Sequence, residues 1–223
     1  MIALEVAEGV HAVVHAHTNC YLVEGEDGVT LVDAGLPSHW YPVQRALGLI
    51  GRRLEDLRGL VITHGHFDHV GIAWRLQQEH GVPVWAHPGD LRIVRHPYRY
   101  QPEGSRVVHP LTHPRGLPVL GSMVAAGALW VRGVDADHEL VPGTLPLPGS
   151  PQVLHTPGHT DGEVVVFLPD RRALITGDAL VTLDPYNGRR GPRIVDPVLQ
   201  AWRSGAAPLA SYPAGSDGPA DWS

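Results

Sequence analysis

The sequence predicts a single α/β domain, and three observations support this fold class. The chain has 223 residues, a length that one domain with one hydrophobic core commonly reaches. Its composition, 43% hydrophobic and 18% charged residues, is that of a globular protein. Short runs rich in β-branched residues alternate with segments of helical periodicity, which is the pattern of a sheet covered by helices.

The N-terminal part of the chain predicts a β-meander followed by a helix. Three short runs are expected as strands, over 10–14, 20–24 and 29–33. Asp27-Gly28 separates the last two runs and is a hairpin-turn signal. Ser38 is the expected N-cap of a helix over 39–50. The apolar positions of that helix lie on one face, at Trp40, Val43, Leu47 and Ile50, so we expect it to cover the sheet.

The rest of the chain alternates between strands and helices. A short polar helix near 54–57 precedes a buried strand over 59–63. The further expected elements are helices over 71–80 and 88–94 and strands over 82–86, 152–155, 163–168 and 173–176. The strand over 59–63 ends directly before a cluster of histidines. Because functional groups are often placed on loops at strand ends, we expect the site there.

The segment 96–148 interrupts this alternation with many prolines and glycines, and we expect it to be an insertion that covers a substrate pocket. Its uncharged run over 117–131 is shorter than the roughly 20 apolar residues of a membrane span, so we interpret it as a buried or pocket-lining helix. The domain is therefore predicted to cover 1–202. The remaining residues, 203–223, are mainly alanine, glycine, proline and serine and form an atypical C-terminal tail.

Charge and cysteine content exclude several classes of protein. A net charge of -6, with histidine neutral, argues against nucleic-acid binding, which usually needs a clustered basic surface. Cys20 is the only cysteine, so any metal ion must be held by nitrogen and oxygen ligands. The first residues include no basic stretch followed by a long apolar run. We therefore expect a cytoplasmic protein with a small-molecule substrate and no membrane partner, whose oligomeric state is open.

The segment Thr63-His64-Gly65-His66-Phe67-Asp68-His69 places four potential metal ligands within a few residues of one another. Imidazole nitrogens and carboxylate oxygens are zinc ligands, and two histidines separated by one residue can point to the same side of a tight loop. The segment therefore favours a metal site, with a solvent-facing histidine-rich loop as the alternative.

Two later segments favour the metal site. His159 follows a Pro157-Gly158 turn at the end of an expected strand, and Asp178 stands in a Thr176-Gly177-Asp178 segment after another. Each segment alone is more often an ordinary loop. Together, three groups of potential ligands after three strands predict a metal centre, at which a carboxylate could bridge two ions.

These segments, together with Leu31-Val32-Asp33-Ala34-Gly35, resemble in their order the metallo-β-lactamase superfamily, over about residues 5–183. The resemblance implies an αββα sandwich with the metal ions between the sheet edges. It also implies that one ion is bound by His64, His66 and His159, that a second is bound by Asp68 and His69, and that Asp178 bridges the two. Asp33 corresponds to a motif that supports the metal loop and is not expected as a ligand.

The family pattern ends with one further histidine, as the last ligand of the second ion, and this chain departs from it. No histidine follows His159, and Ser216 and Asp217 are the nearest candidates for that place. We expect the second ion site to lack its usual last ligand, and the tail 203–223 to be divergent, truncated or frameshifted.

The resemblance also implies an activity. Zinc lowers the pKa of a bound water to about 7, which supplies hydroxide at neutral pH. We therefore expect a hydrolase that uses a metal-bound hydroxide to cleave an ester, thioester or lactone bond, because the segment Asn19-Cys20-Tyr21-Leu22-Val23 is most similar to glyoxalase II-like and lactonase-like members. One or two zinc ions are expected, with iron or manganese as alternatives. Asp68 is the expected catalytic residue, which orients the hydroxide or transfers a proton.

Three alternatives remain open at this point. The first is a mononuclear iron dioxygenase acting on persulfides, with His64, His159 and Asp178 as a two-histidine, one-carboxylate triad. The second is an RNA-processing nuclease, which the acidic balance disfavours. The third is a non-catalytic or weakened relative that lacks the last metal ligand.

Several other residues are weaker candidates. His15 and His17 are expected on one strand face that borders the pocket or solvent, and His155 is expected to support a ligand. Surface or insertion positions are expected for His87, His96, His109, His113 and His138. Three arginines follow Asp178, namely Arg189, Arg190 and Arg193. We interpret them as a solvated charge cluster, with binding of an anionic substrate group as the alternative.

Overall fold

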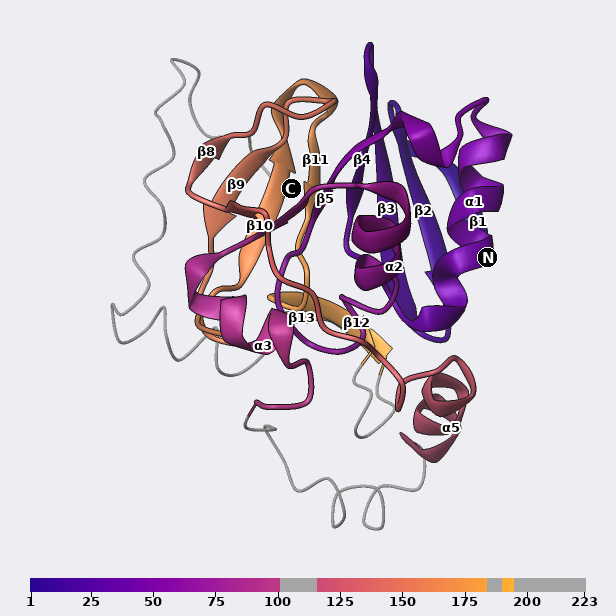
Figure 1. Cartoon of the computed structure of the whole chain (residues 1–223), viewed down its shortest axis with the longest axis vertical. Coiled ribbons are helices and arrows are strands. Elements are labelled where there is room, and N and C mark those ends of the chain that lie inside the picture. Colours follow the sequence, from indigo (N-terminus) through magenta and orange to yellow (C-terminus); the bar gives the residue numbers. More distant parts are fainter. Residues whose placement is uncertain (101–115, 184–189, 195–223) are drawn as a thin grey trace.

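The computed structural model describes residues 1–100, 116–183 and 190–194. Two β-sheets face each other, and helices pack against the outer side of the larger sheet (Figure 1). This mixed α/β architecture confirms the predicted fold class. The expected domain boundary at residue 202 and the tail 203–223 lie outside the described residues.

The larger sheet has seven strands in sequence order. Four of them form an antiparallel meander, namely β1 (Ile2–Ala7), β2 (Val10–His15), β3 (Thr18–Gly25) and β4 (Gly28–Val32). The sheet continues in parallel with β5 (Leu57–Val61), β6 (Val84–Ala86) and β7 (His138–Glu139). A parallel pair needs a crossover connection, and helix α1 (Trp40–Leu49) lies in the connection between β4 and β5. Every strand of this meander except β1 was predicted from the sequence.

The smaller sheet is antiparallel and has the order β11-β10-β9-β8. Its strands are β8 (Gly143–Thr144), β9 (Gln152–His155), β10 (Val164–Leu168) and β11 (Ala173–Ile175). A separate hairpin consists of β12 (Leu180–Leu183) and β13 (Arg190–Ile194). The segment 96–148, expected as an insertion, adds β7 to the edge of one sheet and β8 to the edge of the other.

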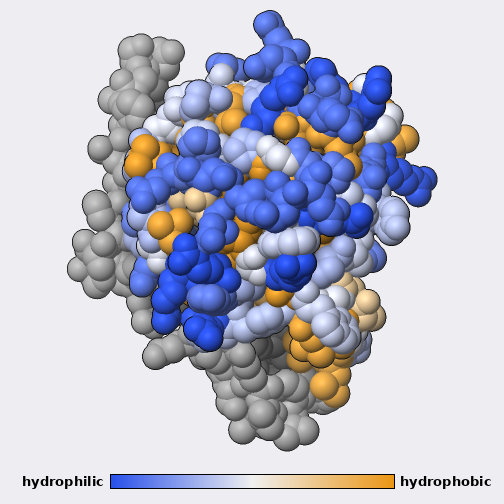
Figure 2. Space-filling model, in the orientation of Figure 1, coloured by the Kyte–Doolittle hydropathy of each residue, from blue (hydrophilic) through white to orange (hydrophobic). Residues whose placement is uncertain are grey.

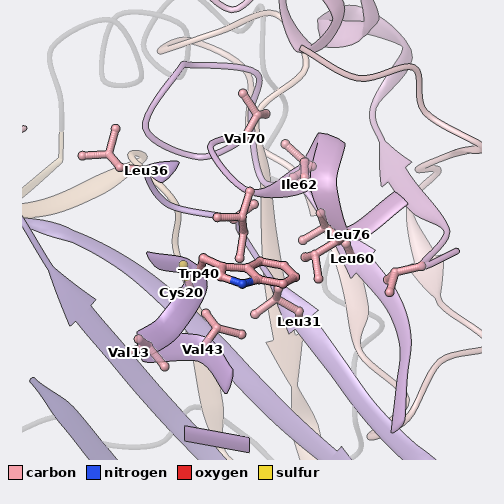
Figure 3. Close-up of a cluster of buried hydrophobic side chains, with 14 of the residues drawn as sticks. Val13, Cys20, Leu31, Leu36, Trp40, Val43, Leu60, Ile62, Val70 and Leu76 are labelled. Atoms are coloured by element: carbon pink, nitrogen blue, oxygen red, sulfur yellow. The ribbon is translucent and has the colours of Figure 1, made fainter. Parts of the chain in front are cut away.

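The hydrophobic core has two main parts, one on each face of the larger sheet. Leu31 of β4 faces the helical side, where it belongs to a cluster with Trp40 of α1 and Leu76 of α2 (Ala73–His80) (Figure 3). The next residue, Val32, belongs to the cluster between the sheets, together with Val166 of β10. Because both faces of β4 are covered, all five of its residues are buried instead of alternating between buried and exposed.

The start of α1 differs from the sequence prediction. Pro37 opens a short 3-10 helix, η1 (Pro37–His39), and His39 rather than Ser38 is the residue that precedes α1. The Ser38 hydroxyl is buried and makes no hydrogen bond to any described residue. The prediction of Ser38 as N-cap was wrong, because a capping residue needs an extended backbone, whereas Ser38 lies inside the 3-10 turn.

The apolar run over 117–131 is buried only in part. It forms α5 (Leu117–Ala125), which buries Val119 and Met123, and the helix ends before Gly127. Several of its side chains are exposed, namely Leu117, Val124, Leu129 and Trp130. Figure 2 shows an apolar group in the region of α5 on a surface that is otherwise largely hydrophilic. Among the described residues, no helix is long and apolar enough to cross a membrane.

The remaining elements are short and lie in the connections between longer helices and strands. They are η2 (Leu54–Asp56), η3 (Pro88–Asp90), α3 (Leu91–Arg95) and η5 (Pro169–Arg171). The expected polar helix near 54–57 is thus a 3-10 turn, and the expected helix over 88–94 is the pair η3 and α3.

Candidate metal centre

The structure brings the three loops that carry the candidate ligands together at one edge of the two sheets. The loops follow β5, β9 and β11, and they contribute His64 to His69, His159 and Asp178 respectively. A backbone hydrogen bond from Val164 N–H to the carbonyl of Thr63, 2.9 Å long, joins the start of β10 to the start of the loop that follows β5. The contact of the sheets therefore places side chains together that are far apart in the sequence.

The first group of possible ligands consists of three histidines. The donor atoms of His64, His66 and His159 all lie within 4.8 Å of one another, and His66 Nδ1 lies 3.0 Å from His159 Nε2. Two ligands at about 2.0 to 2.1 Å from one zinc ion in tetrahedral geometry lie about 3.3 Å apart, which is close to this separation. The Nε2 atom of His64 is buried and makes no hydrogen bond to a described residue. An orphaned buried nitrogen beside two further imidazoles fits a cation site.

The second group lies directly beside the first. It consists of His64, His69 and Asp178, whose donor atoms also lie within 4.8 Å of one another. One oxygen of Asp178 is 3.5 Å from His69 Nε2, and the other is 3.5 Å from His159 Nε2. The two carboxylate oxygens thus face different groups, which is the arrangement that a bridging carboxylate requires. Asp68 lies at the side of the second group, with its Oδ2 atom 4.0 Å from His69 Nε2.

Asp33 contacts the loop that carries His69 and so orients this second group. Its backbone has a φ of +61° directly after β4, and its buried carboxylate accepts a 2.8 Å hydrogen bond from the N–H of Thr63. The Thr63 hydroxyl lies 2.9 and 3.0 Å from the same two oxygens. Nδ1 of His69 lies 2.9 Å from the carboxylate, so a proton on Nδ1 leaves the Nε2 lone pair facing Asp178. This contact agrees with a supporting role for Asp33.

The electrostatic surroundings shift the pKa values of His64 and His69 in opposite directions. Burial lowers the pKa of His64 well below its ordinary value, and the neighbouring histidines lower it further. Burial also opposes the charged form of His69, but Asp33 and Asp178 outweigh it and raise the pKa of His69 well above the ordinary value. Burial raises the pKa of Asp178, whereas the surrounding histidines lower it more strongly, so the pKa lies below its usual range. His64 is therefore neutral and able to donate a lone pair to a cation.

A cavity of about 220 Å³ opens beside the second group. It is lined by Asp68, His69 and Asp178 and by Met123 of α5. His17 borders the same cavity, whereas His15 does not line it. The expectation that these two histidines share a strand face was wrong, because Ala16 and His17 form the two-residue turn between β2 and β3, both with positive φ.

Two functional candidates were missed by sequence reasoning. Glu163 is fully buried below the site, where its Oε1 accepts a 2.8 Å hydrogen bond from the N–H of Asp178 and lies 4.0 Å from His64 Nδ1. Burial raises the pKa of Glu163 to about 8. The second is Asp90, which accepts hydrogen bonds from two ligand-bearing loops. Nothing in the local pattern distinguishes either residue, because both act on loops that are distant in sequence.

The structure describes only some of the weaker candidates named from the sequence. The Nε2 atom of His155 contacts the carbonyl of Asp161 at 2.9 Å, and its ring stacks on His87 at 4.1 Å, so it supports the His159 loop rather than a ligand side chain. His96 and His138 are exposed. Outside the described residues or side chains lie His109, His113, Arg189, Arg190, Arg193, Ser216 and Asp217.

Comparison with known proteins gives the family. A family model described as the metallo-beta-lactamase superfamily matches residues 15–215. The chain belongs to the metallo-β-lactamase superfamily. Its mixed fold with two facing sheets and the position of the candidate centre at the sheet edge are those expected from the sequence resemblance.

Curated members of the superfamily include hydrolases. The chain is 30% identical over 189 residues to the probable metallo-hydrolase YflN of Bacillus subtilis, a match that covers 81% of this chain and 67% of the relative. It is 28% identical over 164 residues to the hydroxyacylglutathione hydrolase GloC of Haemophilus influenzae. This match covers 73% of this chain and 66% of that protein. The chain thus spans about two thirds of the length of these curated relatives.

Solved structures of the superfamily show the same fold. A mutant of the HARLDQ-motif metallo-β-lactamase from Cronobacter sakazakii has a TM-score of 0.56 and 23% identity, over 74% of this chain and 57% of that one. The class B3 di-zinc metallo-β-lactamase LRA-12 from an Alaskan soil metagenome has a TM-score of 0.56 and 19% identity, over 74% of this chain and 55% of that one. At this level of identity the likeness concerns the fold alone.

Proposed function

We propose that this chain is a metal-dependent hydrolase that cleaves an ester, thioester or lactone bond of a small molecule. The observation that supports it most directly is the buried Nε2 atom of His64, which makes no hydrogen bond to a described residue although His64 belongs to both groups of candidate ligands. A buried polar atom without a partner is costly, so its retention at this place favours a bound cation. Membership of the superfamily and the metallo-hydrolase relatives support the same class of activity.

The residues present fit zinc better than a hard cation such as magnesium. The donor set offers three imidazoles in one group and two imidazoles with a carboxylate in the other, whereas magnesium prefers oxygen ligands. One or two ions are proposed, with iron or manganese as alternatives, because imidazole and carboxylate ligands also suit those metals. Zinc at this place would lower the pKa of a coordinated water to about 7 and polarise a substrate carbonyl.

The chain's own residues have separate roles in this proposal. His64, His66 and His159 would hold the first ion, Asp68 and His69 would hold the second, and Asp178 would contribute to both. Asp68 lines the cavity, and its Oδ2 atom lies 4.0 Å from His69 Nε2, so its carboxylate could orient a water or transfer a proton at the centre. Asp68 is therefore proposed as the catalytic residue as well as a ligand of the second ion.

The proposed substrate class rests on the relatives and on the cavity. Hydroxyacylglutathione hydrolase GloC is similar over 73% of this chain, and an acyl group bound to the sulfur of glutathione is a thioester. The cavity combines apolar side chains, Met123, Leu180 and Val181, with the hydroxyl groups of Thr176 and Thr182. An uncharged acyl group can lie against the apolar wall while its carbonyl faces the metal groups.

The proposal is tested by the metal content and by a substrate panel. Purified protein should retain one or two equivalents of zinc by elemental analysis, and the zinc form should hydrolyse at least one ester, thioester or lactone of the panel. Removal of the metal by a chelator should abolish that activity, and zinc should restore it. Full zinc occupancy without activity on any of the three classes would favour a non-catalytic relative.

Two variants test the assignment of the first group. His66→Ala and His159→Ala are expected to lose most of the bound metal while retaining the fold, because each removes one of three ligands without opening the core. His96→Ala is the matched control, since His96 is exposed and lies outside both groups. Unchanged metal content in both ligand variants would refute the assignment.

A mononuclear iron dioxygenase is the second candidate, and one observation favours it. His64 Nε2 and His159 Nε2 lie 3.9 and 3.5 Å from the same oxygen of Asp178, which is a two-histidine, one-carboxylate arrangement. Iron retained after purification and oxygen consumption with a persulfide would support this candidate over the hydrolase.

A further inference from the structure

Asp90 joins two ligand-bearing loops through one buried carboxylate. It is the last residue of η3, and only 1% of its surface is exposed. Its Oδ2 atom accepts a 2.8 Å hydrogen bond from the N–H of Gly65 and a 2.7 Å hydrogen bond from the hydroxyl of Thr160. Its Oδ1 atom accepts a 2.8 Å hydrogen bond from the N–H of Gly162. All three donors belong to loops that contain candidate metal ligands.

The position of these donors relates Asp90 to the first group. Gly65 lies between His64 and His66, and Thr160 follows His159 directly. The same oxygen of Asp90 therefore binds one residue from each loop. His66 Nδ1 and His159 Nε2, one from each of these two loops, lie 3.0 Å apart. A change in the distance between the loops would change the distance between these two nitrogens.

The backbone around Asp90 leaves little room for another arrangement. A Cβ atom on Gly162 would lie 2.6 Å from the nitrogen of Asp90, and a Cβ atom on Gly89 would lie 2.8 Å from the carbonyl carbon of Asp161. Contacts this short are essentially absent for real Cβ atoms, so both positions require glycine. The stacked rings of His87 and His155 add a second contact between the same two segments.

We propose that Asp90 is a positioning residue that sets the separation of the His64-Gly65-His66 loop from the His159 loop, and so determines the metal affinity of the first group. The inference rests on the proposed function, because it requires that the three histidines bind a metal ion. Asp90 itself makes no contact with the proposed ion. It acts by holding two short loops at the distance that a shared ion needs, which reduces the reorganisation required on binding.

Thr160 provides the cleanest test, because its contribution can be removed without a change in charge. Thr160→Val keeps the shape of the side chain but cannot donate to Asp90, whereas Thr160→Ser keeps the hydroxyl. Zinc affinity is measured by competition with a chromophoric chelator. We expect Thr160→Val to weaken zinc binding about tenfold and Asp90→Ala up to about 100-fold, which is the usual range for groups that orient metal ligands. Thr160→Ser should bind zinc with nearly the wild-type affinity.

Two further measurements separate a positioning role from a purely structural one. Thermal unfolding of the metal-free variants shows whether the fold is weakened, and the visible spectrum of the cobalt-substituted proteins reports the ligand geometry. The proposal expects an altered cobalt spectrum in Thr160→Val and a wild-type spectrum in Thr160→Ser. A structural role alone would lower the unfolding temperature of metal-free Thr160→Val and leave its zinc affinity and cobalt spectrum unchanged.

The outcomes also distinguish the inference from the function on which it rests. If the wild-type protein binds no zinc or cobalt, both are overturned. If the wild-type protein binds zinc and Thr160→Val binds it equally well, only the positioning role is overturned. If Asp90→Ala does not fold, the comparison of Thr160→Val with Thr160→Ser still decides the question.

Discussion

The carboxylate of Asp33 lies 2.9 Å from Nδ1 of His69, and this contact directs Nε2 of the same ring toward Asp178. Asp33 also accepts a hydrogen bond from the N–H of Thr63, so one buried side chain connects the end of β4 to both ends of the histidine segment. The positive φ of Asp33 allows the chain to turn sharply there. The orientation of His69, a candidate ligand, therefore depends on its contact with Asp33.

Replacement of Asp33 should destabilise the fold as well as the site. Asp33→Ala leaves the buried N–H and hydroxyl of Thr63 without an acceptor, and we expect it to lower the free energy of unfolding by about 2 to 4 kcal/mol. Asp33→Asn keeps one carbonyl oxygen and tolerates a positive φ, so its effect should be smaller. Urea denaturation of the metal-free proteins measures both values. Equal stability of Asp33→Ala and the wild type would contradict the role given to these hydrogen bonds.

Glu163 should stabilise the Asp178 loop through its hydrogen bond to the backbone. Glu163→Gln can keep an oxygen in place to accept the Asp178 N–H, whereas Glu163→Ala removes the acceptor and leaves a cavity. We expect the alanine variant to be less stable than the glutamine variant by about 1 to 3 kcal/mol. The two unfolding curves are compared in the same buffer without metal. A difference close to zero would mean that the buried hydrogen bond contributes little.

The stability of the fold should depend on the protonation of His39. Burial, together with the nearby His15, whose ring lies 5.4 Å away, lowers the pKa of His39 to about 4. In the unfolded chain the pKa of His39 is near 6.5, so the unfolded state takes up a proton at a higher pH than the folded state. The contribution of neutral His39 to the free energy of unfolding is therefore complete above about pH 6.5 and is lost as the pH falls toward 4. The expected loss is about 3 kcal/mol.

His39→Gln isolates this contribution, because glutamine cannot titrate and still has an oxygen that can accept the N–H of Leu36, as Nδ1 of His39 does at 3.0 Å. We expect the unfolding free energy of the variant to fall less steeply than that of the wild type between pH 6.5 and pH 4. His96→Gln serves as the control, since His96 is exposed. Parallel pH profiles of His39→Gln and the wild type would rule out the assignment.

The turn at Ala16 and His17 should be a point of strain. His17 is exposed with a φ of +66°, a conformation that costs a residue other than glycine about 1 kcal/mol. His17→Gly relieves this strain but adds freedom to the unfolded chain, so we expect a net gain of roughly 0.5 kcal/mol. His17→Val should instead lower the stability, because β-branched side chains tolerate positive φ poorly. Thermal unfolding should rank the variants as glycine, histidine and valine, in falling order.

Local sequence patterns predicted most elements of the fold, and the exceptions have physical reasons. The strands and helices that cover the core have continuous or periodic apolar runs, so their positions follow from burial. Ser38 matched a capping pattern, but the preceding Pro37 opened a 3-10 turn in its place. The run over 117–131 is apolar enough for a buried helix, yet Trp130 is exposed, because the degree of burial depends on what packs against α5.

The sequence by itself determined the set of candidate ligands, since His64, His66, Asp68 and His69 stand at short spacings after one strand, and since His159 and Asp178 follow other strands. The tertiary structure alone decided which of these atoms meet and what holds them. Asp90 and Glu163 look ordinary in the sequence, and their roles arise only because the two sheets bring the ends of β5, β9 and β11 to the same edge. A hydrogen bond between distant loops depends on that packing, and no local pattern encodes it.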